Sequence, residues 1–233
     1  MAELSLNGWW YLGRRKIIER ILNAEFQDRK DLKICDAGCG SGDNISLLSR
    51  FGEVVGLELD DGIRKEAERR NPGIRFLKWV SPEDLNEKFD LILMTDVLEH
   101  IEDDRSAANW VVRHLKKGGC LLLTVPAFDF LWSEMDDVVW HFRRYTRKSL
   151  LGLFPLRVIK FSYYNFFLFP VKVLFVFFSR VSLLLRKREK RSFDEIVPKP
   201  IDIFFRRVLF FEAFLLGWFR FPFGSGIVFL AKK

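Results

Sequence analysis

The stretch that decides the fold is Lys33-Ile-Cys-Asp-Ala-Gly-Cys-Gly-Ser-Gly-Asp-Asn44. Its first five residues are an apolar run typical of a buried strand, and its glycines form a tight turn before a helical pattern at 44–51. Such a turn lets a ligand approach the backbone, because no side chain stands in its way. A second apolar run ends in Glu58, 20 residues after Gly38. A carboxylate at that distance can accept both hydroxyls of a ribose, so the pair predicts a site for a nucleoside-bearing cofactor.

Around this turn, short apolar runs alternate with helical patterns. This alternation is typical of βαβ units and predicts a mostly parallel sheet. We expect a helix after the aromatic cluster Trp9-Trp10-Tyr11, and a helix over 103–116 that ends in a cap at Gly118-Gly119. The further strands are expected at 54–58, 74–79, 90–95, 120–125, 157–161 and 226–232.

The residues in and around the glycine turn do not match the motifs of several other kinds of site. A dinucleotide fingerprint needs Gly-x-Gly-x-x-Gly, but the third position after Gly40 is Asp43. The turn does not end in Gly-Lys-Ser or Gly-Lys-Thr, as a phosphate loop would. A hydrolase elbow, Gly-x-Ser-x-Gly, is also absent, because Cys39 stands two residues before Ser41. The three histidines match no zinc-ligand spacing with the cysteines, so no metal is expected, and His114 is expected on a helix surface.

Four segments together resemble the class I S-adenosylmethionine-dependent methyltransferases. Asp36 to Gly42 resembles their first motif, and Glu58 is similar to their ribose-binding acid. Thr95-Asp-Val-Leu-Glu-His-Ile101 resembles the segment beside the methionine end of the cofactor, and residues 115–125 resemble the element that leads into the fifth strand. The resemblance covers about residues 30–126. It implies a Rossmann-like α/β fold, whose seven-stranded, mostly parallel sheet has an antiparallel last strand.

The same resemblance implies S-adenosyl-L-methionine as the cofactor and names its contacts. The family's adenine-binding acid falls at Ser81, where Ser81 itself, Glu83 or Asp84 would make the contact. Arg14 and the preceding aromatic residues either cap the cofactor or act as hydrophobic anchors. The expected cofactor-binding residues are Asp36, Ala37, Gly38, Cys39, Gly40, Gly42, Asn44, Glu58, Leu59, Ser81, Thr95, Asp96, Val97, His100 and Arg14.

The segment Leu131 to Thr146 is the candidate acceptor site. It follows the fifth strand, and ligands of such sheets bind beyond the carboxyl ends of the strands. It resembles a Trp-Ser…Asp…His-x-Arg-Arg-Tyr segment of one subgroup of these enzymes. The alternative is a salt-bridged lid that only orders the loop. On the catalytic interpretation, His141 or Asp136 is a general base with Tyr145 nearby. The acceptor is bound by Trp132, Arg143 and Arg144, and the two arginines hold its anionic group.

An insertion separates the sixth strand from the seventh and sets the expected domain organisation. We expect an N-terminal cap helix at 1–30, a methyltransferase domain at 31–162 and 223–233, and a Phe-rich, basic, helical insertion at 163–222. Two apolar helices, 166–185 and 201–219, flank the basic run Arg186-Lys-Arg-Glu-Lys-Arg191. This pattern is typical of a segment at an anionic membrane surface. The alternative is a helical subdomain that covers its own core.

Charge and composition limit the classes of function. The chain of 233 residues carries a net charge of +7, and residues 161–233 hold 13 basic and 5 acidic side chains. Three cysteines make no disulfide scaffold, and the N-terminus lacks the layout of a signal peptide, so we expect a cytoplasmic protein, peripheral at the inner face of the membrane. The predicted activity is methyl transfer to a small-molecule or lipid-linked acceptor, at oxygen. The alternatives are a nucleic-acid methyltransferase and a non-catalytic cofactor-binding module with a docking insertion.

Overall fold

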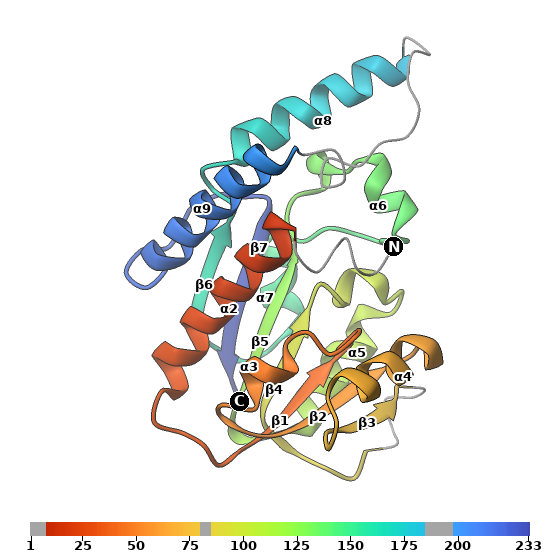
Figure 1. Ribbon diagram of the computed structural model, residues 1–233, viewed down its shortest axis with the longest axis vertical. Coiled ribbons are helices and arrows are strands. Elements are labelled where there is room, and N and C mark those ends of the chain that lie inside the picture. The colour runs from red at the N-terminus through yellow and green to blue at the C-terminus, as the bar shows by residue number, and fades with distance from the viewer. Residues whose placement is uncertain (1–7, 80–84, 185–197) are drawn as a thin grey trace. The chain divides into compact units, whose positions relative to one another are not determined.

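The computed structural model describes residues 8–79, 85–184 and 198–233. Its strands form one seven-stranded sheet in the order β3-β2-β1-β4-β5-β7-β6 (Figure 1). β1 pairs in parallel with β2 and β4, β2 with β3, and β4 with β5, whereas the last strand is antiparallel. The predicted fold class is therefore confirmed. In chain order the strands are β1 (Leu32–Ala37), β2 (Gly52–Glu58), β3 (Arg75–Lys78), β4 (Phe89–Thr95), β5 (Leu115–Pro126), β6 (Arg157–Tyr164) and β7 (Gly226–Lys232).

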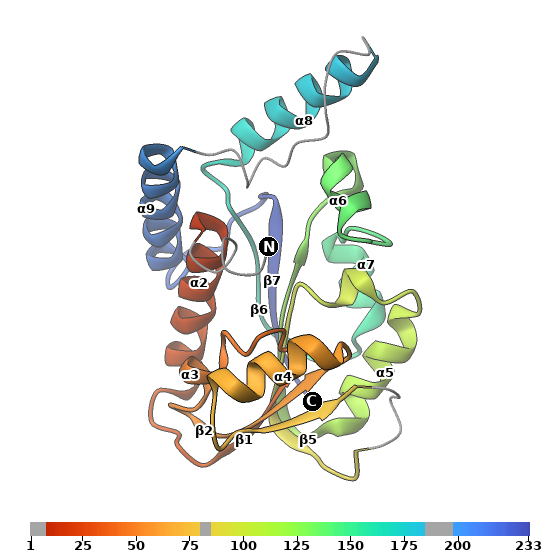
Figure 2. The ribbon, with the colours of Figure 1, turned by 45° about the vertical axis from the view of Figure 1, so that its right-hand side comes forward.

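Helices connect these strands, as the alternating pattern predicts. α4 packs against β2 and β3, and α5 lies beside α7 (Figure 2). Two helices, α8 and α9, lie between β6 and β7 along the chain, where the insertion was expected. The helices are α2 (Trp9–Phe26), α3 (Ile45–Leu48), α4 (Asp61–Arg70), η1 (Leu98–His100), α5 (Asp104–His114), η2 (Asp129–Leu131), α6 (Glu134–Val138), α7 (Arg147–Leu153), α8 (Phe169–Leu184) and α9 (Lys199–Leu215).

The chain divides into two compact units. Unit 1 consists of Met1–Glu25, Pro126–Tyr145 and Ser162–Ile227, and unit 2 of Phe26–Val125, Thr146–Phe161 and Val228–Lys233. Unit 2 contains the glycine-rich turn, and unit 1 contains the candidate acceptor segment with α8 and α9. The domain boundaries expected from the sequence remain a prediction.

Two neighbouring strands of unit 2, β1 and β4, are buried on both faces. In β1, Ile34 and Cys35 are fully buried, and in β4 the run Leu91 to Met94 is fully buried as well. Strands covered on both sides need continuous apolar runs rather than alternation, which explains why these segments were recognisable in the sequence.

The end of α5 differs from the prediction. The helix ends at His114, and residues 115–126 form one long strand, so Gly118 and Gly119 do not cap a helix. The pairing of β5 with β4 shifts between Phe89 and Leu91, and Gly118 takes a left-handed φ of +82°. A Cβ at Gly119 would lie 2.9 Å from the carbonyl oxygen of Phe89. These glycines therefore allow a close approach at an irregularity of the sheet.

His114 is buried, and the expectation that it lies on a helix surface is wrong. Its imidazole stacks on Trp110 with ring centroids 4.5 Å apart. Nδ1 lies 2.8 Å from the carbonyl oxygen of Trp110, and Nε2 lies 2.9 Å from that of Leu85. The side chain thus serves the packing of α5 rather than its solvated face.

In unit 1, α2 packs along α9, and both views show the two helices side by side (Figures 1 and 2). The aromatic cluster forms the first residues of α2 rather than preceding the helix. Trp9 is buried, with its ring centroid 5.2 Å from that of Phe205. A Cβ at Gly13 would overlap Leu209, so glycine permits the close approach of the helices. Asp202 of α9 accepts the backbone N–H of Trp9 at 2.8 Å.

Glu212 is a fully buried carboxyl in α9 that accepts the backbone N–H groups of Asn165, Phe166 and Phe167. Burial raises the pKa of Glu212 from its ordinary 4.5 to about 7, although these hydrogen bonds act in the opposite direction. The folded protein therefore keeps this proton to a higher pH than the unfolded chain does, and its stability falls as the pH rises from 4.5 to 7.

We expect Glu212→Gln to remove this pH dependence. Relative to the variant, the wild type should lose about 3 kcal/mol of unfolding free energy between roughly pH 5 and pH 8, because each pKa unit corresponds to about 1.4 kcal/mol. Urea unfolding of both proteins at the two pH values measures the difference. Parallel pH profiles would show that Glu212 does not titrate in this range.

Candidate functional site

The glycine-rich turn after β1 is held by backbone hydrogen bonds. The N–H groups of Gly38 and Cys39 both donate to the carbonyl oxygen of Leu57, at 2.8 and 2.9 Å. Gly38, Gly40 and Gly42 have φ values of +74°, +54° and +81°, a region that favours glycine. These backbone bonds hold the start of the turn against the end of β2.

Glu58 closes one side of this turn. One carboxylate oxygen accepts the N–H of Gly40 at 2.9 Å, and the other accepts the N–H of Asp60 at 3.0 Å. Two carboxylate oxygens offer about four acceptor positions, so further donors such as ribose hydroxyls can still be bound. The carboxylate is held beside the turn before any ligand arrives.

One glycine of the turn leaves its backbone open to a ligand. A Cβ at Gly40 would meet no heavy atom within 4 Å, whereas one at Gly38 would overlap the side chain of Val97. Gly40 thus faces open space beside the carboxylate of Glu58. An adenosine-bearing group can be held there by Glu58 and by the turn's backbone.

A second group of polar residues lies where β4 and β5 end. Asn44 Nδ2 donates to Thr95 Oγ1 at 3.3 Å, and Thr124 Oγ1 donates to Asp96 Oδ1 at 2.9 Å. Asp96 has a left-handed φ of +52°, an uncommon backbone for a residue other than glycine. Strained residues of this kind occur often at ligand sites.

The other expected cofactor residues have diverse positions. Asp36 and Ala37 are buried in β1, and burial raises the pKa of the Cys39 thiol, which keeps that thiol neutral. Leu59 and His100 are exposed, at the ends of β2 and η1 respectively. Ser81, Glu83 and Asp84 lie outside the described residues. Arg14 belongs to unit 1, where its guanidinium lies 5.0 Å from the ring centroid of Tyr11.

Sequence analysis missed two residues that support this site. Arg70, at the end of α4, donates to Ser41 Oγ at 2.8 Å and forms an ion pair with Asp43 at 2.8 Å. Thr124 of β5 supports Asp96. No spacing pattern connects either residue with its partner, because the contacts arise from the packing of separate elements.

Two alanine substitutions separate the folding role of the turn from its binding role. We expect Gly38→Ala to lower the melting temperature strongly, because its Cβ would overlap Val97. Gly40→Ala should cost only about 1–2 kcal/mol of stability, the penalty of a left-handed backbone, yet weaken cofactor binding because its methyl group occupies the open space. Thermal unfolding and titration calorimetry measure the two effects. Unchanged cofactor affinity in Gly40→Ala would exclude Gly40 from the cofactor site.

The candidate acceptor segment, in unit 1, is organised around one buried carboxylate. Asp136 accepts two hydrogen bonds from the guanidinium of Arg144, at 2.8 and 2.9 Å. It also accepts Nδ1 of His141 at 2.8 Å, and the backbone N–H and hydroxyl of Ser133 at 2.8 and 3.0 Å. Burial alone would raise the pKa of Asp136, but these hydrogen bonds and the Arg144 charge outweigh it and hold the pKa well below its ordinary value.

This geometry distinguishes the two candidate bases. Asp136 is a poor general base, because a carboxylate with such a low pKa and five donors has little affinity for another proton. His141 differs, because Asp136 holds its Nδ1–H and the lone pair of the neutral ring is then on Nε2. Tyr145 is buried at 1% exposure, and its backbone bonds to Pro126 and Phe128, which favours a packing role over contact with an acceptor.

The expected acceptor-binding residues also divide. The guanidinium of Arg144 binds Asp136 and the carbonyl oxygen of Ala127, so we revise its role from anion binding to support of the segment. Arg143 is half-buried and remains the candidate for an anionic group. Trp132 donates its indole N–H to Asp137 at 3.0 Å, and its carbonyl oxygen accepts Arg180 of α8 at 2.9 Å.

The insertion is described in part. The basic run 186–191 lies outside the described residues. Within the parts of the chain that are described, no helix combines the length and the apolar character that a crossing of the bilayer needs.

The chain is similar in sequence and in fold to known methyltransferases. Residues 9–159 match the family described as a methyltransferase domain. The chain is 33% identical over 99 residues to a trans-aconitate 2-methyltransferase of Methylobacterium nodulans, covering 40% of this chain and 38% of that protein. It is 23% identical over 149 residues to a ubiquinone/menaquinone biosynthesis C-methyltransferase of Campylobacter jejuni, covering 59% and 60%. An S-adenosylmethionine-dependent methyltransferase structure from Mesorhizobium loti shares the fold, with a TM-score of 0.57, 17% identity and coverage of 91% and 96%.

The chain belongs to the methyltransferase-domain family, which covers well over half of its length. The family predicted from the sequence, that of the methyltransferases, is thereby confirmed. The chain spans less than half the length of the trans-aconitate methyltransferases to which it is similar, 38% of one and 43% of another.

Proposed function

We propose that this protein transfers the methyl group of S-adenosyl-L-methionine to an oxygen atom of a small-molecule or lipid-linked acceptor. The observation that carries the proposal is the carboxylate of Glu58, held by the N–H of Gly40 beside an open glycine turn. When bound, the cofactor supplies a methyl group that its sulfonium activates. The residues of the chain have to bind and orient the cofactor and the acceptor, and to take up the acceptor's proton.

His141 is our candidate for the proton acceptor. Asp136 orients its imidazole and stabilises the imidazolium that forms when Nε2 takes a proton from a hydroxyl group. A hydroxyl oxygen needs such a base, since it loses its proton as the methyl group is added. The pair therefore favours an oxygen acceptor.

Other residues of unit 1 support a proposal about the acceptor. Arg143 offers a positive charge to an anionic acceptor, and the name of the trans-aconitate relative includes an acid acceptor. The exposed aromatic side chains of α8 and α9 favour an acceptor with an apolar tail, met at the inner face of an anionic membrane. A basic charge interleaved with phenylalanines does not suit the tracking of nucleic-acid phosphates.

We expect Glu58→Gln to weaken cofactor binding by about 10–100-fold, because hydrogen bonds to a charged group contribute roughly 1.5–3 kcal/mol each. Titration calorimetry with S-adenosylmethionine and its demethylated product measures the change. Glu53→Gln, in the same strand but exposed, is the matched control and should bind as the wild type does. Equal affinity of all three proteins would remove Glu58 from the proposed site.

The acceptor can be identified by label transfer. The protein and cofactor labelled in the methyl group are incubated with cell extract, and the label is separated into lipid, small-molecule and nucleic-acid fractions. We expect the label in the lipid and small-molecule fractions. Chemical analysis of the labelled product should identify it as an O-methyl compound. Label in nucleic acid, or a C-methyl product, would contradict the proposed acceptor. Cofactor binding without any transfer would favour a non-catalytic module.

A further inference from the structure

α8 and α9 carry large apolar side chains that are more than half exposed. In α8 these are Leu174, Phe177 and Phe178, and in α9 they are Phe204, Phe211 and Phe214. Each of the six is between 52 and 63% exposed. We call these six residues the aromatic face. Single exposed apolar residues are ordinary, but a gathering of this kind marks a site of interaction.

The buried face of α9 shows that this exposure does not reflect a poorly packed helix. Phe205, Leu209 and Ala213 recur at helical spacing and are buried, and Trp9 and Leu168 belong to the same core cluster as Phe205 and Leu209. The core of unit 1 is thus complete on that side. The aromatic face is an additional apolar surface on the other sides of the helix.

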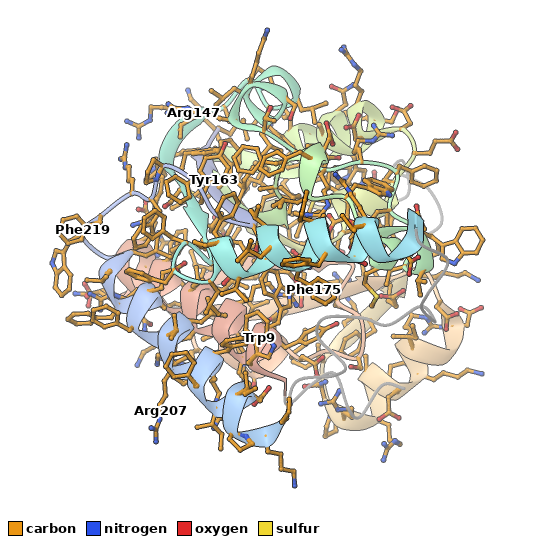
Figure 3. The ribbon with its side chains drawn as sticks, turned by 90° about the horizontal axis from the view of Figure 1, so that it is seen from above. Trp9, Arg147, Tyr163, Phe175, Arg207 and Phe219 are labelled. Atoms are coloured by element: carbon orange, nitrogen blue, oxygen red, sulfur yellow. The ribbon has the colours of Figure 1, made fainter. Side chains whose placement is uncertain are left out.

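The exposed charges beside the aromatic face are positive. Arg180 of α8 and Arg207 of α9 are exposed, and Figure 3 shows Arg207 and Phe219 projecting outward. α8 contains no acidic residue. The two acids of α9 are engaged internally, since Asp202 accepts the N–H of Trp9 and Glu212 is buried. Trp218, 63% exposed after α9, adds an amphipathic ring of the kind enriched at membrane interfaces.

We propose that the aromatic face docks this protein on the surface of an anionic lipid bilayer, with α8 and α9 lying in the interface. Phenylalanines that insert into the bilayer interface contribute favourable apolar burial to the binding free energy. Arginine side chains can extend past them to the lipid phosphates. The proposal depends on the proposed function only for its purpose, which is access to a lipid-linked acceptor. Docking itself can be tested without turnover.

α8 contacts the acceptor segment and the residues just before it, all within unit 1. Arg180 Nη2 donates to the carbonyl oxygen of Trp132, at the start of the segment that contains Asp136 and His141. At the other end of α8, Phe169 lies edge-to-face with Phe130 at 6.3 Å. A bilayer bound by α8 is therefore adjacent to the segment proposed to hold the acceptor.

The test is flotation of the full chain with vesicles. One set contains equal parts of phosphatidylcholine and phosphatidylglycerol, and the other contains phosphatidylcholine alone. We expect wild-type protein to float with the anionic vesicles and to bind the neutral ones about tenfold less. Two double variants, Leu174→Ser with Phe178→Ser and Phe204→Ser with Phe211→Ser, should each reduce binding about tenfold or more. The control, Ile63→Ser with Leu151→Ser, removes two exposed apolar side chains of unit 2 and should float as the wild type does.

Other outcomes would overturn the proposal. Wild-type protein that stays with neither vesicle, or variants that float as the wild type does, would show that the aromatic face does not bind lipid. Light scattering without vesicles tests another occupant, since a dimer broken by the same substitutions would mean that a second copy covers the face. Thermal melts confirm folding, and cofactor calorimetry on the same preparations separates failure of docking from failure of the proposed function.

Discussion

Methyl transfer by His141→Ala is expected to be about 10²–10⁴-fold slower than by the wild type, with unchanged affinity for the cofactor. The reason is the loss of Nε2, the nitrogen that carries the lone pair while Asp136 holds Nδ1–H at 2.8 Å. Label transfer to the acceptor fraction measures the rate, and calorimetry measures the affinity. Added imidazole should restore part of the rate, because it supplies the missing base without changing the fold.

Phe142→Ala is the matched control for this experiment, because Phe142 is the next residue and is exposed. It should keep the wild-type rate. If His141→Ala transferred methyl groups as fast as Phe142→Ala does, His141 would not be the base. The segment would then be the ordering lid that the sequence also allows.

Asp136→Asn is expected to lower the free energy of unfolding by about 3–5 kcal/mol. The substitution leaves the buried guanidinium of Arg144 without its charged partner, and breaking a buried ion pair from one side is strongly destabilising. Because the pKa of Asp136 is held below its ordinary value of 3.8, the carboxylate's contribution is present above about pH 4. It is lost only as the pH falls below that range. Urea unfolding at neutral pH measures the effect.

The neighbouring Asp137 is the control for Asp136. It is exposed and accepts one hydrogen bond, from the indole of Trp132, so Asp137→Asn should cost about 1 kcal/mol or less. Equal urea midpoints for the two variants would contradict the role of Asp136 as the centre of the segment. A stable Asp136→Asn protein that still lost transfer would instead restrict Asp136 to orienting His141.

The fold was predictable because its signals are local. The apolar runs of β1 and β4, the glycines at 38, 40 and 42, and Glu58 each appear within a few residues of sequence. Gly118 and Gly119 were misjudged for the same reason. A pair of glycines after a helical pattern suggests a cap, and only the shifted pairing of β5 with β4 shows their place in a strand.

The acceptor segment was predictable in composition but not in roles. Its spacing pointed to Asp136, His141 and Arg144 together, yet it gave no means to decide which side chain binds which. Packing decides the pairing. The Asp136 carboxylate is buried at 1% exposure and needs hydrogen-bond donors, and Arg144 donates two of them.

The order of residues along the chain is sufficient to determine the methyltransferase family and the glycine-rich turn, because a strand, a tight turn and an acid at the next strand's end form a short-range pattern. Tertiary structure alone decided that Arg144 supports Asp136, that Glu212 is buried against residues 165–167, and that the six side chains of the aromatic face are more than half exposed among the described residues. Those features depend on the burial of groups far apart in sequence, and burial is a property of the packed molecule.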